Sequence, residues 1–454
     1  MNKYRFVHLS DIHFGQERPG DIKIHSDVRE QLLSDCEIWS ARLGPATGVI
    51  VTGDIAYSGK TDEYTRAGEW LDRLTEIIGC EHEAVHLVPG NHDIDRLRIS
   101  RGVQMWHDDL RRVESSELEN LFESLLDNET ESDLLFEKLA SYIEFASGYA
   151  DIDPVKKPVW TWDLPLDRSN TLCLVGMNTV QVSDKLDSLG RMVLGANQYI
   201  LTVKKNVEYV ALMHHPLEWM KDVEKARDYL KRVRVLMFGH EHKGKTLKVN
   251  DGKGNEWLEL YAGATNPPEI KGETYHYSYN WIEFSLEEDD GKAILCTVIH
   301  PRIWRNDPPQ FTRDDAYGGS EEEGVVMKLT CPHFTLLKEP TIETKHTRPA
   351  ETQLISASEE GSTMGKVSNE DQFSKLRFYF WRHLDWRQRL TVLSKLNALP
   401  ESLDKPIPQT MERLALDGLN KSGRLRELWK EIMEYVPENK RGPNPFTQEG
   451  ERKV

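Results

Sequence analysis

The sequence predicts an α/β fold in which a mostly buried sheet is flanked by helices. Short apolar runs alternate with helical patterns up to about residue 340, and the runs end in Gly, Asp, Asn or His. Runs of this length that are rich in β-branched or bulky apolar residues indicate strands with both faces covered. The clearest predicted strands are residues 6–9, 49–51, 86–88, 172–175, 210–213 and 233–238, and residues 279–284 and 293–298 are more typical of antiparallel strands.

The chain is predicted to contain two domains joined by a linker. The first domain spans residues 1–338, and a helical stretch at about 95–154 interrupts its strands directly after a polar motif. We interpret that stretch as an insertion that could cover a site. Residues 339–370 are rich in Thr, Ser, Glu and Pro, which is typical of a flexible linker. Residues 371–454 are helical in pattern and predict a small all-α C-terminal domain.

An aromatic cluster in the C-terminal domain allows two interpretations. Its members are Phe378, Tyr379, Phe380, Trp381 and Trp386. The first interpretation is the core of a small helical bundle, because aromatic side chains dominate cores. The second is a protein-binding face, through which residues 371–454 would deliver the chain to a partner. The domain then resembles the small helical adaptors attached to bacterial defence effectors, although without a specific motif.

Composition excludes several classes of protein. The 454 residues carry a net charge of −17, and no apolar run is long enough to cross a bilayer. The N-terminus lacks the apolar stretch of a signal peptide, and the five scattered cysteines form no CxxC pair. We therefore expect a cytoplasmic protein with free thiols and no membrane partner. The negative charge disfavours binding to nucleic acid unless a local basic patch overrides it.

Five polar motifs follow predicted strands. They are Asp11-Ile12-His13, Gly53-Asp54, Gly90-Asn91-His92-Asp93, His214-His215-Pro216 and Gly239-His240-Glu241-His242. Residues just past the carboxyl ends of strands gather in one crevice of an α/β sheet. Together they offer carboxylates, an amide oxygen and imidazoles, a mixture that suits Mn²⁺, Fe or Zn²⁺ better than Ca²⁺ or Mg²⁺ alone. Turn formation by Asp, Asn and Gly explains any single motif, but not all five.

The order D-x-H, G-D, G-N-H-D, H and G-H-x-H resembles that of the calcineurin-like metallophosphoesterase superfamily. The resemblance covers roughly residues 1–300. The segments at residues 8–13 and 53–59 are most similar to class III cyclic-nucleotide phosphodiesterases, and a related pattern occurs in nucleases of the superfamily. The resemblance implies a four-layer α/β/β/α sandwich.

The resemblance also implies a metal site and two catalytic residues. Two divalent metal ions are expected, Mn in the first place and Fe or Zn as alternatives. Asp11, His13 and His242 would bind the first ion, Asn91, His214 and His240 the second, and Asp54 would bridge both. His92 would lie beside the scissile phosphate, oriented by Asp93. Paired cations clamp phosphate oxygens and activate a bridging water. A protonated His92, favoured by the Asp93 carboxylate, could then donate a proton to the leaving oxygen.

Three further residues near these motifs have less specific predictions. Neighbours on a strand point to opposite sides, so His214 is the expected ligand and His215 a supporting or substrate contact. His107 lies in the helical insertion and is expected to be structural. Tyr57 follows Asp54 closely, and we expect it to pack rather than to react.

The predicted function is a metal-dependent phosphodiesterase acting on a nucleotide, such as a cyclic nucleotide. One alternative is a DNA or RNA nuclease that is recruited through its C-terminal domain. A protein phosphatase is a third possibility. The expected substrate is thus a nucleotide or nucleic-acid phosphodiester. The sequence contains no Gly-x-Ser-x-Gly elbow or dinucleotide fingerprint, which argues against other hydrolase and nucleotide-binding classes.

Overall fold

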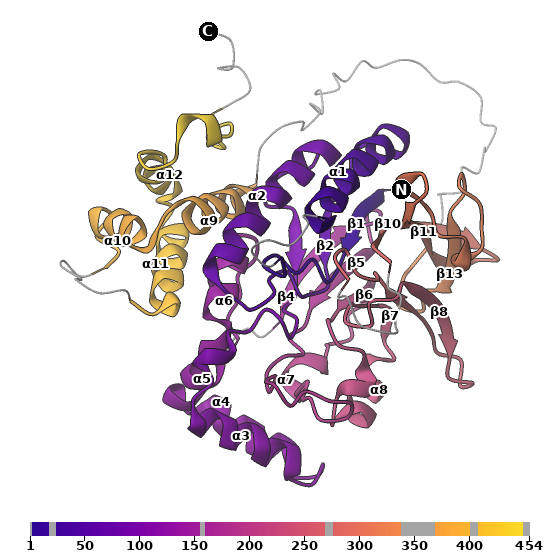
Figure 1. Ribbon diagram of the computed structural model, residues 1–454, viewed down its shortest axis with the longest axis horizontal. Helices are drawn as coiled ribbons and strands as arrows, with labels where there is room; N and C mark the ends of the chain where they lie inside the picture. Colours follow the sequence, from indigo (N-terminus) through magenta and orange to yellow (C-terminus); the bar gives the residue numbers. More distant parts are fainter. Residues whose placement is uncertain are drawn as a thin grey trace, which may run out of the picture.

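The computed structural model describes residues 2–17, 24–154, 159–267, 276–336, 368–399 and 407–447. Within these ranges the strands form one sheet of seven and one of six (Figure 1). All eight predicted strands are present, which confirms the α/β class.

The first sheet has the order β12-β11-β10-β1-β2-β3, with β13 paired to β11. β1, β2 and β3 are parallel, whereas the pairs that involve β10 to β13 are antiparallel. The strands are β1 (Lys3–Leu9), β2 (Gly48–Val51), β3 (Val85–Leu87), β10 (Ser278–Asp289), β11 (Lys292–Asn306), β12 (Pro309–Arg313) and β13 (Val325–Thr330).

The second sheet has the order β4-β5-β6-β7-β9-β8. Its four central strands are parallel, and both edge strands are antiparallel to their neighbours. The strands are β4 (Trp160–Pro165), β5 (Thr171–Gly176), β6 (Val207–Leu212), β7 (Val233–Phe238), β8 (Lys245–Asn250) and β9 (Glu256–Tyr261).

Alternation along the strands produces four layers. Phe6 of β1 and Met237 of β7 point between the sheets and share one core. Val7, the next residue of β1, belongs instead to the core beneath the helices on the outer side. On the second sheet, Ala211 of β6 likewise belongs to the core beneath the helices on the outer side. The covering helices are α1 (Ile24–Leu43) and α2 (Thr61–Ile78) on one side, and α7 (Ala196–Tyr199) and α8 (Val223–Leu230) on the other. The predicted α/β/β/α sandwich is confirmed.

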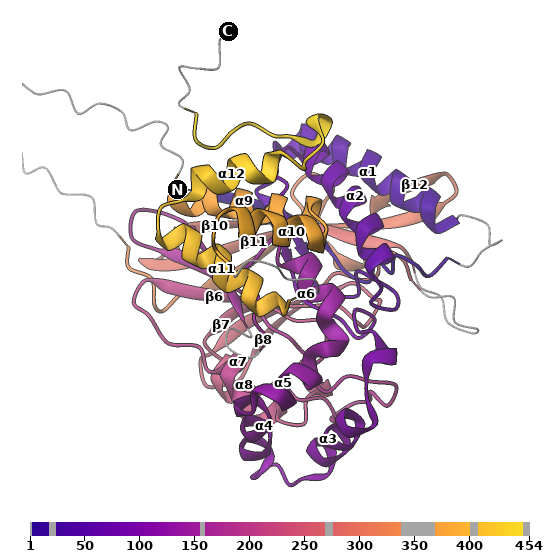
Figure 2. The ribbon, with the colours of Figure 1, turned by 90° about the vertical axis from the view of Figure 1, so that its left-hand side faces the viewer.

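The segment between β3 and β4 is mainly helical. Its elements are η1 (Arg96–Arg98), α3 (Arg101–Arg112), α4 (Leu118–Asp127), α5 (Glu129–Phe136), η2 (Glu137–Leu139) and α6 (Ala140–Ala146). α6 packs against α2, and α3 to α5 lie near α7 and α8 in both views (Figures 1 and 2).

The C-terminal helices pack against α2 and α6 (Figure 2). Arg382 lies 3.5 Å from Asp72 of α2 and 5.0 Å from the ring centre of Phe145 in α6. Arg413 pairs with Asp153 at 3.0 Å. The helices are α9 (Asn369–His383), α10 (Trp386–Lys395), α11 (Gln409–Lys421), α12 (Leu425–Met433) and η5 (Glu438–Lys440). Of the predicted linker, residues 339–370, the part up to residue 367 lies outside the described residues. Residues 369 and 370 of the predicted linker belong to the start of α9.

The aromatic cluster of this region lies mostly in the interior. Phe378, Tyr379, Phe380 and Trp381 are buried, and Trp386 is half-buried. Their side chains therefore serve the core, as the first interpretation held, and a partner would have to contact other residues.

Candidate metal centre

The polar motifs converge at the carboxyl ends of strands from both sheets. Asp11 and His13 follow β1, Asp54 follows β2 and Asn91 follows β3, all in the first sheet. His214 follows β6, and His240 and His242 follow β7, in the second sheet. Because these strands are parallel within each sheet, their carboxyl ends open at one edge of the sandwich. The structure brings together all seven residues that were predicted to bind metal.

The backbone at these positions is unusual. Among the described residues, eight that are not glycine have a positive φ, and five of these eight are predicted ligands. They are Asp11, His13, Asp54, His240 and His242, with φ between 51° and 65°. Such conformations cost free energy and persist where the surrounding structure enforces them. Five of them in one cluster indicate that the fold holds these side chains in place for a purpose other than stability.

Two glycines of the motifs are explained by close approach. A Cβ on Gly90 would lie 2.1 Å from Oδ1 of Asp54 and 2.4 Å from its backbone nitrogen. A Cβ on Gly53 would lie 2.5 Å from Nδ1 of His214, and Gly53 itself has a φ of 92°. Any other residue at either position would push the predicted ligands apart.

The predicted ligands fall into two groups on either side of Asp54. In the first group, Nε2 of His242 lies 3.1 Å from Oδ1 of Asp11. Nε2 of His13 lies 3.2 Å from Oδ2 of Asp54. The side-chain donor atoms of Asp11, His13 and His242 all lie within 4.8 Å of one another.

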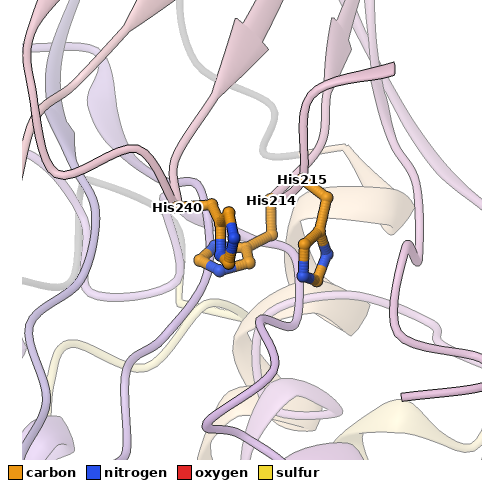
Figure 3. Close-up of side chains that lie close together, drawn as sticks. All are labelled: His214, His215 and His240. Atoms are coloured by element: carbon orange, nitrogen blue, oxygen red, sulfur yellow. The ribbon is translucent and has the colours of Figure 1, made fainter. Parts of the chain in front are cut away.

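The second group surrounds the amide of Asn91. Its Oδ1 lies 3.1 Å from Nε2 of His214 and 3.1 Å from Nδ1 of His240. Nε2 of His214 is also 3.4 Å from Oδ2 of Asp54, so one oxygen of Asp54 contacts a histidine of each group. Figure 3 shows the rings of His214 and His240 side by side, with His215 next to them.

The electrostatics of the cluster favour bound cations. Asp11 and Asp54 are fully buried carboxylates, and each has an oxygen within 3.4 Å of a histidine nitrogen. Burial opposes their ionisation, yet the surrounding histidines hold the pKa of Asp11 at about 2. In turn, Asp54 outweighs the effect of burial and raises the pKa of His214 to about 9. Protonated histidine thus carries the positive charge beside these carboxylates that bound cations would otherwise supply. The donor set of carboxylates, imidazoles and an amide fits divalent metal ions.

His92 is oriented differently from the expectation. Its Nδ1 lies 2.8 Å from the backbone carbonyl of Tyr57, and its ring stacks on that of Tyr57. The prediction that Asp93 orients His92 is therefore wrong. Burial also lowers the pKa of His92, although Asp54 partly offsets this effect, so the structure does not favour the protonated form.

Asp93 instead connects two loops of the site through hydrogen bonds. Its buried carboxylate accepts hydrogen bonds from the backbone of Gly90 (2.9 Å), Ile55 (3.2 Å) and Ala56 (2.9 Å). The hydroxyl of Tyr64 donates a further bond at 3.0 Å. Burial, together with the nearby Asp54, raises the pKa of Asp93 to about 7. Asp93 is thus a positioning residue that joins the loop of Asp54 to the loop of Asn91.

The less specific predictions had different outcomes. His215 does not point away from its neighbour, because both histidines come after the end of β6, where strand alternation no longer applies. Its Nδ1 lies 2.9 Å from Oγ1 of Thr179, and its buried Nε2 has no hydrogen-bond partner. Tyr57 packs on the rings of His92 and His13, as expected, and 39% of the residue stays exposed.

His107 has the structural role that was expected. It lies 2.9 Å from Asp184 and 3.2 Å from the buried amine of Lys138, away from the predicted ligands.

Sequence reasoning missed several neighbours of the site. The backbone carbonyls of Thr52 and Asn266 accept from Nδ1 of His214 (2.8 Å) and His13 (3.1 Å). No sequence signal reveals such carbonyls, because every residue has one. Arg96 and Trp219 also lie beside the site, and only the tertiary structure brings them there.

The comparisons with known proteins agree with this geometry. Residues 4–244 match the model of the calcineurin-like phosphoesterase family, which covers more than half of the chain. The chain therefore belongs to the calcineurin-like phosphoesterases, which are phosphoester hydrolases that use divalent metal ions. Residues 372–434 match the model of the GTPase-associated adaptor domain.

One curated relative is described as similar to metallophosphoesterases. The chain is 25% identical over 339 residues to YydB of Bacillus subtilis (strain 168), an "uncharacterized metallophosphoesterase-like protein". The match covers 71% of this chain and 64% of the length of YydB.

The similar solved structures are distant. Purple acid phosphatase PPD1 from yellow lupin (Lupinus luteus) has a TM-score of 0.36 and 12% identity, over 69% of this chain and 53% of that one. The NAD nucleotidase of Haemophilus influenzae has a TM-score of 0.33 and 10% identity, over 69% and 54%. Within the described ranges, no helix has both the length and the apolar character needed to cross a membrane.

Proposed function

We propose that this chain is a binuclear, metal-dependent phosphodiesterase that hydrolyses a nucleotide-type phosphodiester. The observation that carries the proposal is the position of Asp54. One of its two carboxylate oxygens, Oδ2, lies within 3.4 Å of a histidine from each group of predicted ligands. A carboxylate so placed can bridge two ions, and the remaining six predicted ligands divide evenly between them. Mn²⁺ is the proposed metal, with Fe and Zn²⁺ as alternatives, because mixed oxygen and nitrogen ligands accept all three.

When bound, two such cations supply Lewis acidity and a hydroxide nucleophile. The residues of the chain hold and orient the other reacting groups. Nδ1 of His92 is occupied by the carbonyl of Tyr57, which leaves Nε2 as the ring nitrogen available to the leaving oxygen. A phosphodiester anion beside the ring would favour its protonated form and offset the effect of burial. His92 is thus the proposed proton donor, and Asp93 positions the loops on both sides of it.

A nuclease is the second candidate, and one basic segment favours it. Arg96, Arg98 and Arg101 follow the Asn91 motif, and all three are exposed. The match of residues 372–434 to an adaptor-domain model supports recruitment by a protein partner. Since the aromatic cluster is buried, the exposed Met411 and Leu414 of α11 are the proposed contact residues. The free cysteines are in keeping with a cytoplasmic location.

The class of reaction can be tested with two chromogenic substrates. We expect the Mn²⁺-loaded chain to hydrolyse bis-p-nitrophenyl phosphate faster than p-nitrophenyl phosphate. Hydrolysis of the monoester alone would contradict the diesterase proposal.

The role of His92 can be tested in the same assay. His92→Ala should lower kcat by roughly a hundredfold, which is typical of a lost acid–base group, and should keep its bound metal. His333→Ala, which removes a histidine outside the site, is the matched control and should behave as wild type. Equal loss of metal and activity in His92→Ala would make His92 a ligand instead.

A further inference from the structure

Two aromatic rings border the candidate metal centre on its two flanks. Tyr57 contacts His92 and His13, which lie on the side of the first group of predicted ligands. Trp219 contacts His240 and His215, which lie on the side of the second group (Figure 3 shows these two histidines). The metal centre thus lies between a tyrosine and a tryptophan.

Tyr57 presents its ring beside the proposed proton donor. The ring stacks on that of His92, with centres 5.0 Å apart and an angle of 25° between the planes. It meets His13 edge-on at 6.0 Å. Despite these contacts, 39% of the residue is exposed. The backbone carbonyl of Tyr57 accepts a hydrogen bond from His92, which keeps this residue next to the proposed proton donor.

Trp219 is held on the opposite flank. It ends η3 (Leu217–Trp219), and its ring lies 4.2 Å from that of His240, nearly perpendicular to it. The backbone is fixed at both ends, because its N–H donates to Pro216 at 3.0 Å and its carbonyl accepts from Met192 at 2.9 Å. The side chain is half-buried, so part of the indole faces outward.

The positively charged Arg96 lies next to Asn91, one of the predicted metal ligands. The guanidinium of Arg96 donates to the backbone carbonyl of Asn91 at 3.2 Å, and the residue is exposed. Within the described residues, no carboxylate forms an ion pair with it, in contrast to Arg98, which pairs with Asp95. A planar guanidinium with unused donors suits a second phosphate group.

We propose that Tyr57 and Trp219 are specificity-determining residues that stack on the two bases flanking the scissile phosphodiester, while Arg96 binds a neighbouring phosphate. The substrate class is then single-stranded nucleic acid. Double-stranded nucleic acid keeps its bases in the helix, and a cyclic nucleotide has one base where the site offers two rings. The inference rests on the proposed phosphodiesterase activity. In the reaction, a water oxygen bonds to phosphorus, the P–O bond to the leaving nucleoside breaks, and the leaving oxygen gains a proton.

The experiment compares two substrates on the full-length, Mn²⁺-loaded chain. One is a single-stranded oligonucleotide with one cleavable phosphodiester, and the other has abasic residues on both sides of that bond. We expect kcat/KM of the wild type to be at least tenfold higher for the base-bearing substrate, since stacking on one aromatic residue is worth about tenfold in affinity. Tyr57→Leu and Trp219→Leu should each lower this ratio about tenfold, mainly through KM. Tyr57→Phe keeps a ring and should keep the ratio.

Controls separate this inference from other roles. Tyr229→Leu, at a partly exposed tyrosine of α8, should leave the ratio unchanged. Arg96→Gln should raise KM for both substrates and flatten the dependence on salt. If Tyr57→Leu lowers kcat/KM equally for both substrates, the ring supports His92 and the stacking inference fails. If the wild type cleaves a diester but shows a ratio near one, the inference fails while the proposed function stands. If it cleaves no diester at all, the proposed function itself fails.

Discussion

Two of the clusters of ionisable side chains in the interior of the described residues can be compared, and their contrast separates a site from a scaffold. One is the candidate metal centre. The other, here called the insertion cluster, consists of His107, Arg111, Lys138, Asp184 and Asp187, and it joins the helical insertion to the loop before α7. Both contain histidines and carboxylates at the same depth, so burial and residue type do not tell them apart.

The insertion cluster is almost saturated with hydrogen bonds. Lys138 donates to the carbonyls of Gln181 (2.7 Å) and Ser183 (2.9 Å) and lies 3.2 Å from Nε2 of His107. Asp184 accepts from Arg111 at 2.8 Å and lies 2.9 Å from Nδ1 of His107. Arg111 pairs with both carboxylates of the cluster, and none of its five residues has a positive φ.

The metal centre differs in each of these respects. Its carboxylates face histidines rather than arginine, and five of its residues have a positive φ. Several strained backbone positions in one cluster are typical of a site that binds a ligand. The difference teaches that backbone strain and the partners of the carboxylates, rather than the presence of histidine, mark the functional cluster.

The largest expected effect is on the metal centre. Asp54→Ala should lower diester hydrolysis about a thousandfold or more, because it removes the carboxylate that would hold both cations, and these would supply several kcal/mol of charge stabilisation. It should also bind less metal by elemental analysis. A chelator should lower the unfolding temperature of the wild type but not that of Asp54→Ala, since bound ligand stabilises only the form that binds it. An Asp54→Ala variant that kept its metal would contradict this assignment.

The matched change in the insertion cluster should act on stability. Asp184→Ala leaves the buried His107 without its acceptor and removes one of the two buried-cluster carboxylates that pair with Arg111, and breaking such a buried pair typically costs about 3–5 kcal/mol of unfolding free energy. The folded fraction should keep its metal. Denaturant unfolding measures the effect, and Asp62→Ala, which removes an exposed partner of Arg66, should leave stability almost unchanged. A drop in metal content without a loss of stability would reverse the contrast between the two clusters.

The smallest expected effect is on the stability of the fold at acidic pH. Burial, followed by the charge of Lys138, lowers the pKa of His107 to about 4. Between that value and its ordinary pKa, near 6.5, the unfolded chain binds one more proton, so this histidine weakens the fold as the pH falls through that window. His107→Asn should remove this contribution and flatten the acid limb of the stability curve by up to about 1.4 kcal/mol per pH unit. Unfolding at several pH values tests it, with the exposed His276→Asn as control. An unchanged slope in His107→Asn would show that His107 is already protonated in the folded chain.

Much of the metal centre could be predicted because it is built from local patterns. Each predicted ligand stands within four residues of a strand end, and parallel strands place their carboxyl ends together. The orientation of individual side chains was less predictable. Asp93 was assigned to its neighbour His92, but its oxygens bind the backbone of residues 55, 56 and 90. Sequence adjacency says little about contacts inside a tight turn.

The sequence by itself determined the class of fold, eight of the strands and the residues that meet at their ends, because alternation and turn chemistry are local properties. Only the tertiary structure decided which histidines are saturated and which are open. It paired His107 with Asp184, at a distance of 77 residues along the chain, and placed Trp219 against His240. It also packed α9 onto α6 and paired Arg382 of α9 with Asp72 of α2. Such contacts depend on how separate elements pack, and no periodicity within one element encodes them.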